Sequence, residues 1–184
     1  MILLVGLGNP TPDSNDNRHN IGFKIIDAIN QKFGLSKQKP KFKGLLTTGN
    51  ISNKKVYAIK PLTFMNNSGI CIRELIEYFK MDAENVIVFH DDLDINFGKI
   101  KAKFGGTSAG HNGVESIDKF IGKDYSRVRI GIGKPKSNVT DYVLKDFEQE
   151  VILELKKITE NIIGSLEILI DKKLELFSST VNNK

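Results

Sequence analysis

The three histidines are the side chains of this protein best suited to acid–base chemistry. An imidazole titrates near neutral pH, so it can take a proton from water or give one to a leaving group. His19, His90 and His111 each have polar, acidic or glycine-rich neighbours, where packing in a hydrophobic core would not explain them. They also lie where predicted strands give way to loops or helices, which is where open α/β sheets place their sites. The pattern predicts an enzyme.

Carboxylate and amide side chains accompany these histidines. Asp91 directly follows His90, and a carboxylate can fix the orientation and tautomer of an imidazole. Asp92 and Asp94 fit the ordinary roles of loop and cap residues. Amides supply uncharged donors and acceptors, which suit recognition of an ester carbonyl, a ribose or a base edge. The asparagines in predicted turns are Asn9, Asn20, Asn66, Asn67 and Asn112.

Two glycine-rich segments suggest other chemistry. Gly6–Pro10 begins like a dinucleotide-binding loop, but the third glycine is missing and Pro10 stands where a helix should offer free N–H groups. Gly106–Gly110 matches the G-x-S-x-G pattern of serine esterases, which would make Ser108 a nucleophile. That elbow needs a buried strand before it and a histidine well downstream, whereas a lysine-rich segment precedes Ser108 and His111 follows almost at once. Both interpretations are weaker than the histidine hypothesis.

The segment His90–Asp94 could also be interpreted as a metal site. One histidine and three aspartates lie close together at the end of a predicted strand. A strand end rarely brings consecutive side chains onto one point, and no cysteine or second histidine lies at ligand spacing. We therefore predict neither a metal nor a cofactor.

Composition indicates a single globular domain. The chain has 184 residues and a net charge of +5, and no apolar run approaches the roughly 18 residues that span a membrane. No basic segment typical of a signal peptide precedes the first apolar run. Cys71, the only cysteine, can form no internal disulfide. We expect a cytoplasmic monomer without membrane contact, with one domain over residues 1–184 whose last residues, 179–184, fray.

Positive charge indicates nucleic-acid binding only where it is clustered. Lys99, Lys101 and Lys103 alternate with apolar residues, so a strand would carry all three ammonium groups on one face. Arg127 and Arg129 alternate in the same way. The two segments are the best candidates for a basic surface.

Strand and helix patterns alternate along the chain. Apolar runs predict strands at 2–7, 45–51, 55–59, 86–89 and 128–133, and the basic segment is a further strand. Helical spacing predicts helices at 21–33, 68–79, 113–121 and 147–170, the first ended by Gly34 and the second capped by Ser68. A basic loop is expected at 37–43. The fold class is α/β, a single three-layer domain with a twisted mixed β-sheet flanked by helices.

Taken together, these residues resemble the bacterial peptidyl-tRNA hydrolase family. The resemblance runs from Val5 to about Phe147 and rests on separate blocks in the family's order. The blocks are Val-Gly-Leu-Gly-Asn-Pro at 5–10, Arg-His-Asn-Ile-Gly at 18–22, Lys-Pro-Leu-Thr-Phe-Met-Asn-Asn-Ser-Gly at 60–69, His-Asp-Asp-Leu-Asp at 90–94, Gly-His-Asn-Gly at 110–113, Arg-Ile-Gly-Ile-Gly at 129–133 and Tyr-Val-Leu at 142–144. Several ordered blocks are far more specific than any one glycine motif.

The resemblance implies a metal-independent hydrolase that cleaves the ester between a peptide and the terminal ribose of tRNA. Such an enzyme recycles tRNA from chains that the ribosome releases prematurely. Matched position by position, His19 resembles the base that activates water and Asp91 the carboxylate that orients it. Asn9 and Asn66 resemble the groups that place the substrate carbonyl and the peptide end, and Met65 resembles a residue lining that cleft.

The resemblance also implies the contacts with tRNA. Asn112 resembles the residue that grips the 3′ end of the tRNA, and His111 is assigned to the same binding cleft. Lys101, Lys103 and Arg129 fall where the family contacts the 5′ phosphate. The implied partner is peptidyl-tRNA, bound through its acceptor stem, 3′ end and 5′ phosphate.

Some positions depart from the family pattern. Thr11 and Ser14 stand where the family usually has glycine and tyrosine, which leaves open the cleft shape and the peptide contacts near Ser14. The segment 107–109 makes the loop before His111 less glycine-rich than usual. The alternative function is a non-catalytic RNA-binding relative of the same fold. Loss of His19 or Asp91 would indicate that relative, and both residues are present.

Overall fold

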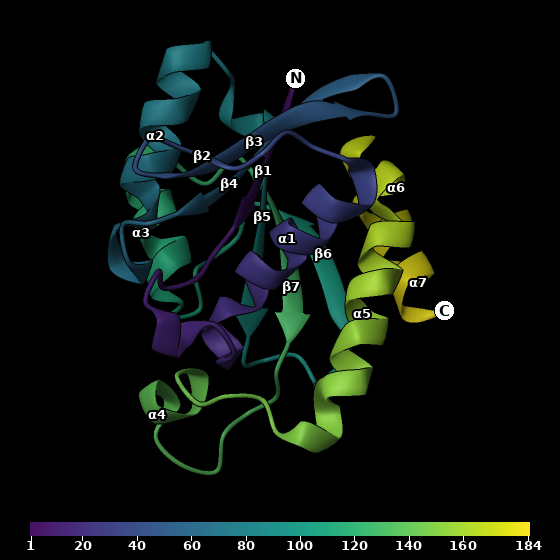
Figure 1. Ribbon diagram of the computed structural model, residues 1–184. Helices are drawn as coiled ribbons and strands as arrows, with labels where there is room; N and C mark the ends of the chain where they lie inside the picture. The colour runs from purple at the N-terminus through teal and green to yellow at the C-terminus, as the bar shows by residue number, and fades with distance from the viewer.

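The computed structural model describes residues 1–184 and contains one seven-stranded β-sheet with helices on both faces (Figure 1). The strand order is β2-β3-β4-β1-β5-β7-β6. The four central strands, β4, β1, β5 and β7, run parallel, while β3 and β6 pair antiparallel with them on either side. The strands span Ile2–Gly6 (β1), Lys39–Lys41 (β2), Gly44–Ile51 (β3), Lys54–Pro61 (β4), Val86–Asp92 (β5), Ile100–Phe104 (β6) and Ser126–Gly131 (β7). The predicted mixed sheet of an α/β fold is confirmed.

Helices cover the two faces of the sheet with two separate apolar cores. On one face α1 and the C-terminal helices α5–α7 pack together, and on the other α2 packs beside α3 (Figure 1). The helices span Ile21–Phe33 (α1), Ser68–Phe79 (α2), Asn112–Ile121 (α3), Val139–Val143 (α4), Ile152–Gly164 (α5), Leu166–Ile170 (α6) and Leu174–Asn182 (α7), and short 3-10 helices span Pro12–Ser14, Arg18–Asn20, Met65–Asn67, Ala83–Asn85 and Gln149–Val151. Successive residues of β1 alternate between the cores, as the two-residue period of a strand requires. Among these helices, none is both long and apolar enough to cross a membrane.

The C-terminal region differs from the sequence prediction. The segment expected to be one helix at 147–170 contains α5 and α6, and a further helix, α7, follows them. Within the tail predicted to fray, over 179–184, the helix continues as far as Asn182. The Asn182 side chain bonds both backbone groups of Ile100 at 3.0 and 2.7 Å. The Ser178 hydroxyl also accepts from the Ala102 N–H at 2.9 Å. Because β6 is an edge strand, its outward backbone groups need partners, and α7 supplies them.

Three local predictions also need correction. Ser68 does not cap α2, because its hydroxyl donates to the carbonyl of Met65 at 2.9 Å within the preceding turn. The expected basic loop contains β2, which pairs with β3. His90 is buried within β5, so core packing does account for one of the three histidines.

The register of the central strands brings the predicted site residues together. Gly6, the last residue of β1, pairs in register with Phe89 of β5. Because β5 continues to Asp92, Asp91 lies beyond the end of β1. The Leu7 N–H still donates to Phe89 at 3.1 Å, which holds the chain leading to Asn9 against β5. Gly22 lets α1 approach, since a Cβ there would collide with the backbone of Leu7. The start of α1, and with it His19, is therefore held at the carboxyl end of the sheet.

Candidate active site

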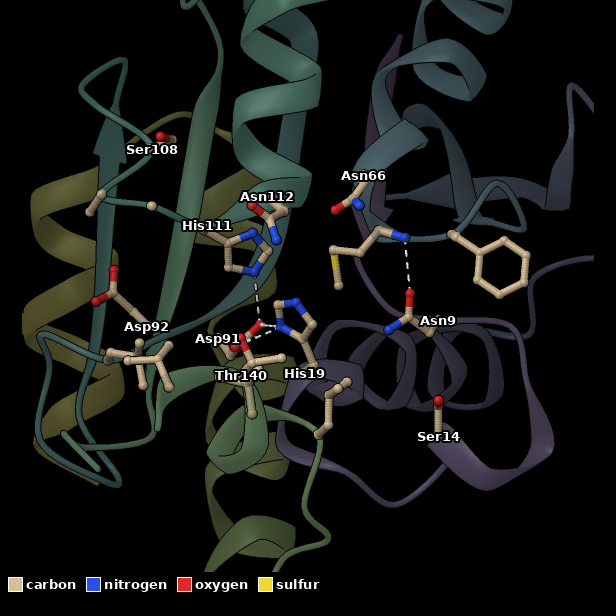
Figure 2. Close-up of a pocket in the computed structure, with 18 of the residues that line it drawn as sticks. Asn9, Ser14, His19, Asn66, Asp91, Asp92, Ser108, His111, Asn112 and Thr140 are labelled. Carbon is tan, nitrogen blue, oxygen red and sulfur yellow. Dashed lines mark hydrogen bonds and ion pairs between the residues drawn. The ribbon is translucent and has the colours of Figure 1, made fainter. Parts of the chain in front are cut away.

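A cleft of about 570 Å³ opens beyond the ends of β1 and β5 (Figure 2). The predicted site residues that line it are Asn9, Ser14, His19, Met65, Asn66, Asp91, His111 and Asn112. The remaining three, Lys101, Lys103 and Arg129, lie on β6 and β7 outside this lining. The structure thus separates a cleft with acid–base groups from a basic surface on neighbouring strands.

His19 and Asp91 form the central pair of the cleft. Nδ1 of His19 lies 2.9 Å from both carboxylate oxygens of Asp91, although the residues are 72 positions apart in sequence. An ionised carboxylate can only accept, so Nδ1 of the neutral imidazole carries the proton and Nε2 keeps its lone pair. His19 stands in the 3-10 helix before α1, and its neighbour Arg18 is fixed by a bond to the carbonyl of Asp146 at 2.8 Å. The ring is therefore oriented as a general base requires.

His111 binds the same carboxylate from the other side. Its Nε2 lies 2.8 Å from Oδ1 of Asp91 (Figure 2). Its Nδ1 accepts from the backbone N–H groups of Gly113 and Val114 at 3.2 and 3.3 Å. These backbone donors open α3, so His111 is the N-cap of that helix. Because Nδ1 accepts, Nε2 must donate. Both nitrogens of His111 are therefore engaged within the protein, although the residue lines the cleft.

The two histidines determine the charge state of Asp91. Burial acts to raise the pKa of the Asp91 carboxyl, but His111 and His19 outweigh it and hold that pKa below its usual value of 3.8. His90 behaves differently, because its burial penalises the charged imidazolium and lowers the pKa of His90 to about 3. Its Nδ1 bonds the carbonyl of Asp91 at 2.7 Å. His90 is thus a neutral part of the wall.

The same bonds argue against a metal at this centre. The ligand atoms of His19, Asp91 and His111 lie within 4.8 Å of one another, which is close enough to suggest an ion. However, Nε2 of His111 carries its proton and offers no lone pair to a metal. The side chains of the alternative cluster at 90–94 are not directed at one point. Asp92 instead bonds Arg129 at 2.7 Å and the N–H of Asp94 at 2.8 Å. Hydrogen bonds within the protein account for these side chains.

Asn9 is held in one orientation by three hydrogen bonds. Its Oδ1 accepts from the Met65 N–H at 2.9 Å, which leaves its Nδ2 as a donor for the cleft (Figure 2). The Asn20 side chain accepts from the Asn9 N–H at 2.8 Å and donates to the Asn9 carbonyl at 2.9 Å. Sequence reasoning noted Asn20 among the turn asparagines but assigned it no role. Its position directly after His19 was the available signal.

Phe64 is a cleft residue that sequence reasoning missed. It is 56% exposed at the rim and has φ 60° and ψ 159°, a backbone conformation that is costly for any residue except glycine. Such strain costs on the order of 1–3 kcal/mol and persists only where the surroundings enforce it. Here it turns the chain so that the next N–H, that of Met65, faces Asn9. No residue pattern in the segment 60–69 signals this conformation.

Other predicted residues lie around these groups. Asn66 and Asn112 are exposed where α2 and α3 begin, and Figure 2 shows both side chains at the cleft. The Ser14 hydroxyl lies 2.7 Å from that of Thr11, so the two residues that depart from the family pattern bond each other. Ser108 also lines the cleft, but both nitrogens of His111 are engaged elsewhere. His111, the only histidine that follows Ser108 in the sequence, is therefore not free to activate Ser108 as an esterase nucleophile.

The basic side chains share one face of β6 and β7. Lys101 pairs in register with Arg129, and Lys103 pairs with Arg127. Lys101 and Lys103 are exposed, Arg129 is partly exposed and Arg127 is buried. We call Lys101, Lys103 and Arg129 the basic face. The loop at 105–111 connects the basic face to the cleft. The loop begins soon after Lys103, and its later residues line the cleft.

Comparisons with known proteins identify the family of this chain. The family model described as peptidyl-tRNA hydrolase matches residues 3–184. A peptidyl-tRNA hydrolase of Pelagibacter ubique (strain HTCC1062) is 80% identical, with 100% of both chains covered. One from Ehrlichia canis (strain Jake) is 43% identical over 98% of this chain and 94% of the relative. The crystal structure of peptidyl-tRNA hydrolase from Acinetobacter baumannii superposes with a TM-score of 0.92 at 32% identity, covering 99% of this chain and 94% of that one. The chain belongs to the peptidyl-tRNA hydrolase family.

Proposed function

We propose that this protein hydrolyses the ester that joins a peptide to the terminal ribose of peptidyl-tRNA, with His19 as the general base. The observation that carries the proposal is the His19–Asp91 pair, bonded at 2.9 Å in the cleft of a chain that matches the family model over residues 3–184. Asp91 keeps the imidazole in the tautomer whose Nε2 can accept a proton. No metal ion is needed for this chemistry. Peptidyl-tRNA arises during translation, so we infer that the enzyme is cytoplasmic. We also propose that it works as a monomer.

The reaction follows from the positions of three groups. Nε2 of His19 takes a proton from a water molecule as the water oxygen attacks the ester carbonyl carbon. The Asn9 Nδ2 group donates to the carbonyl oxygen while negative charge develops on it. When the bond between the carbonyl carbon and the ribose oxygen breaks, the imidazolium returns its proton to that oxygen. The products are a peptide with a free carboxyl group and a tRNA with a free hydroxyl.

The remaining predicted residues bind the two parts of the substrate. Met65, Asn66 and Asn112 all line the cleft. Asn66 and Met65 would contact the peptide end, and Asn112 would contact the 3′ end of the tRNA. Lys101, Lys103 and Arg129 would bind the 5′ phosphate. Phosphate contacts position nucleic acid without reading its sequence, which suits an enzyme acting on many tRNAs.

The proposal is tested with N-acetylated aminoacyl-tRNA and with unblocked aminoacyl-tRNA, both in EDTA. Wild-type protein should release the N-acetylamino acid from the blocked substrate and should leave the unblocked substrate intact. His19→Ala should fold normally and lose roughly 10²–10⁴-fold in turnover, the usual contribution of a general base. Ser108→Ala is the matched control, because it removes a cleft hydroxyl that the mechanism does not use.

Two outcomes would overturn the proposal. If the wild type binds tRNA but releases nothing, the protein is the non-catalytic RNA-binding relative. If Ser108→Ala abolishes turnover and His19→Ala does not, the protein is a serine esterase.

A further inference from the structure

Arg127 is the one cation of the β6–β7 pair that the protein withdraws from solvent. Its side chain is 3% exposed, although it alternates along β7 with the partly exposed Arg129 and lies opposite the exposed Lys103. A buried guanidinium is costly unless it is paired and hydrogen-bonded. Asp118 of α3 supplies the pairing carboxylate at 2.8 Å, and the Tyr125 hydroxyl donates to the same carboxylate oxygen at 2.7 Å. Asp118 thus holds the guanidinium, and Tyr125 holds Asp118 in place.

Both terminal nitrogens of Arg127 also donate to the backbone of the loop that precedes α3, while Nε is buried without a partner. Nη1 donates to the Thr107 carbonyl at 2.7 Å, and Nη2 donates to the Gly106 carbonyl at 3.1 Å. Two successive carbonyls of the loop are therefore held by one rigid guanidinium. A lysine could not reproduce this, because its ammonium is a single point rather than a planar fork.

This loop forms a wall of the cleft. The residues at 108–110 line it, and His111 at its end bonds Asp91. The loop has an irregular backbone, with positive φ at Gly105, Gly106, Ala109 and Gly110. Such a segment makes few bonds of its own, so its position depends on its anchors. Arg127 holds its beginning and His111 holds its end.

We propose that Arg127 is a positioning residue, which anchors the loop at 105–111 so that the cleft wall is formed and His111 reaches Asp91. It is not part of the phosphate-binding surface, although it lies on the same strand face as Arg129. The effect of Arg127 on catalysis rests on the proposed function, through the roles of His19 and Asp91. The anchoring of the loop is independent of that function, and it can be measured without substrate.

The test compares Arg127→Lys with Tyr125→Phe. Arg127→Lys keeps the charge but loses the fork that holds the two carbonyls. Tyr125→Phe keeps the ring against Arg127 and removes one bond to the same Asp118, while both loop bonds remain. Amide hydrogen exchange is measured on each protein, together with kcat and KM for N-acetylaminoacyl-tRNA and the salt dependence of tRNA binding.

For Arg127→Lys we expect exchange at the amides of 105–111 to rise roughly tenfold or more, since bonds from a charged donor are lost. Amides of the central strands should be unchanged. The ratio kcat/KM should fall, while the salt dependence of tRNA binding stays as in wild type. Tyr125→Phe should leave loop exchange and kcat/KM unchanged, even where it lowers the melting temperature.

Two results would overturn the inference. If Arg127→Lys leaves loop exchange unchanged and flattens the salt dependence, Arg127 is a phosphate ligand. If both variants accelerate exchange uniformly, Arg127 serves only overall stability. Should Arg127→Lys fail to fold, Arg127→Gln gives the decision, because its neutral amide removes the buried charge and cannot hold both loop carbonyls. A selective rise in loop exchange then supports anchoring, and a uniform rise or no change refutes it. Activity of the wild type is scored separately, so the proposed function can stand while this inference fails.

Discussion

The cleft centre and the basic face differ in how firmly the protein holds their side chains. In the centre, Asp91 is 2% exposed and bonds two histidines, while Asn9 is fixed by Met65 and Asn20. On the basic face, Lys101 and Lys103 extend into solvent from a strand. Arg129 is intermediate, since its guanidinium bonds Asp92 at 2.7 Å while its side chain stays 26% exposed.

The difference matches what each region has to do. Proton transfer and oxyanion stabilisation depend on geometry to within fractions of an ångström, so their groups must be oriented before the substrate arrives. A phosphate can be bound by a mobile cation, because the attraction is long-ranged and weakly directional. We therefore expect substitutions in the centre to change kcat, stability and pH dependence, and substitutions on the face to change KM and salt dependence.

Among substitutions that leave His19 in place, the largest effect should come from removing the charge of Asp91. Asp91→Asn keeps the shape but no longer stabilises the imidazolium that forms on His19. We expect kcat to fall roughly 10²-fold, with a smaller change in KM. Steady-state kinetics with blocked aminoacyl-tRNA checks this. If KM alone rises, then Asp91 binds substrate and does not orient the base.

The next effect concerns stability in acid. The pKa of His90 is about 3 in the folded protein, against 6.5 for an ordinary histidine. Between these pH values, His90 is protonated in the unfolded chain and neutral in the folded protein. Stability should fall as pH drops from 6.5 towards 3, with a slope of up to about 1.4 kcal/mol per pH unit from this group. The lowered pKa of Asp91 adds a loss only below 3.8, so the window from 6.5 to 4 isolates His90.

Urea unfolding of His90→Gln across that window provides the measurement. The variant should lack most of the slope, so its stability deficit relative to wild type should shrink as pH falls. Parallel curves for the two proteins would mean that His90 is not the titrating group.

The smallest effect should come from the basic face. Lys103→Ala should raise KM several-fold, leave kcat unchanged and reduce the slope of log K against log salt by about 1. Lys32→Ala, at the exposed end of α1, is matched in charge and should change none of these. If Lys103→Ala lowers kcat and leaves the salt dependence unchanged, then the basic face contributes to the chemical step, and the proposed difference between the two regions is wrong.

Much of the site was predictable because its residue types identify its chemistry. His19, Asp91 and Asn9 combine a base, an orienting carboxylate and a neutral donor, and the alternation of strands and helices places such groups at strand ends. The same local periodicity predicted most strands and helices. It could not predict α7, whose role of capping the edge of β6 depends on contacts 82 residues away.

The sequence alone determined the α/β class, the residues available for catalysis and the basic alternation on two strands, because each follows from residue types at short spacing. Tertiary structure decided how these residues are used. Arg127 and Arg129 have the same alternation, yet only Arg127 is covered, because α3 and the loop pack over it. His111 binds Asp91 and caps α3, so it holds the centre through both nitrogens. Burial and hydrogen-bond partners depend on segments that come into contact only in the folded protein. A local sequence pattern therefore cannot predict them.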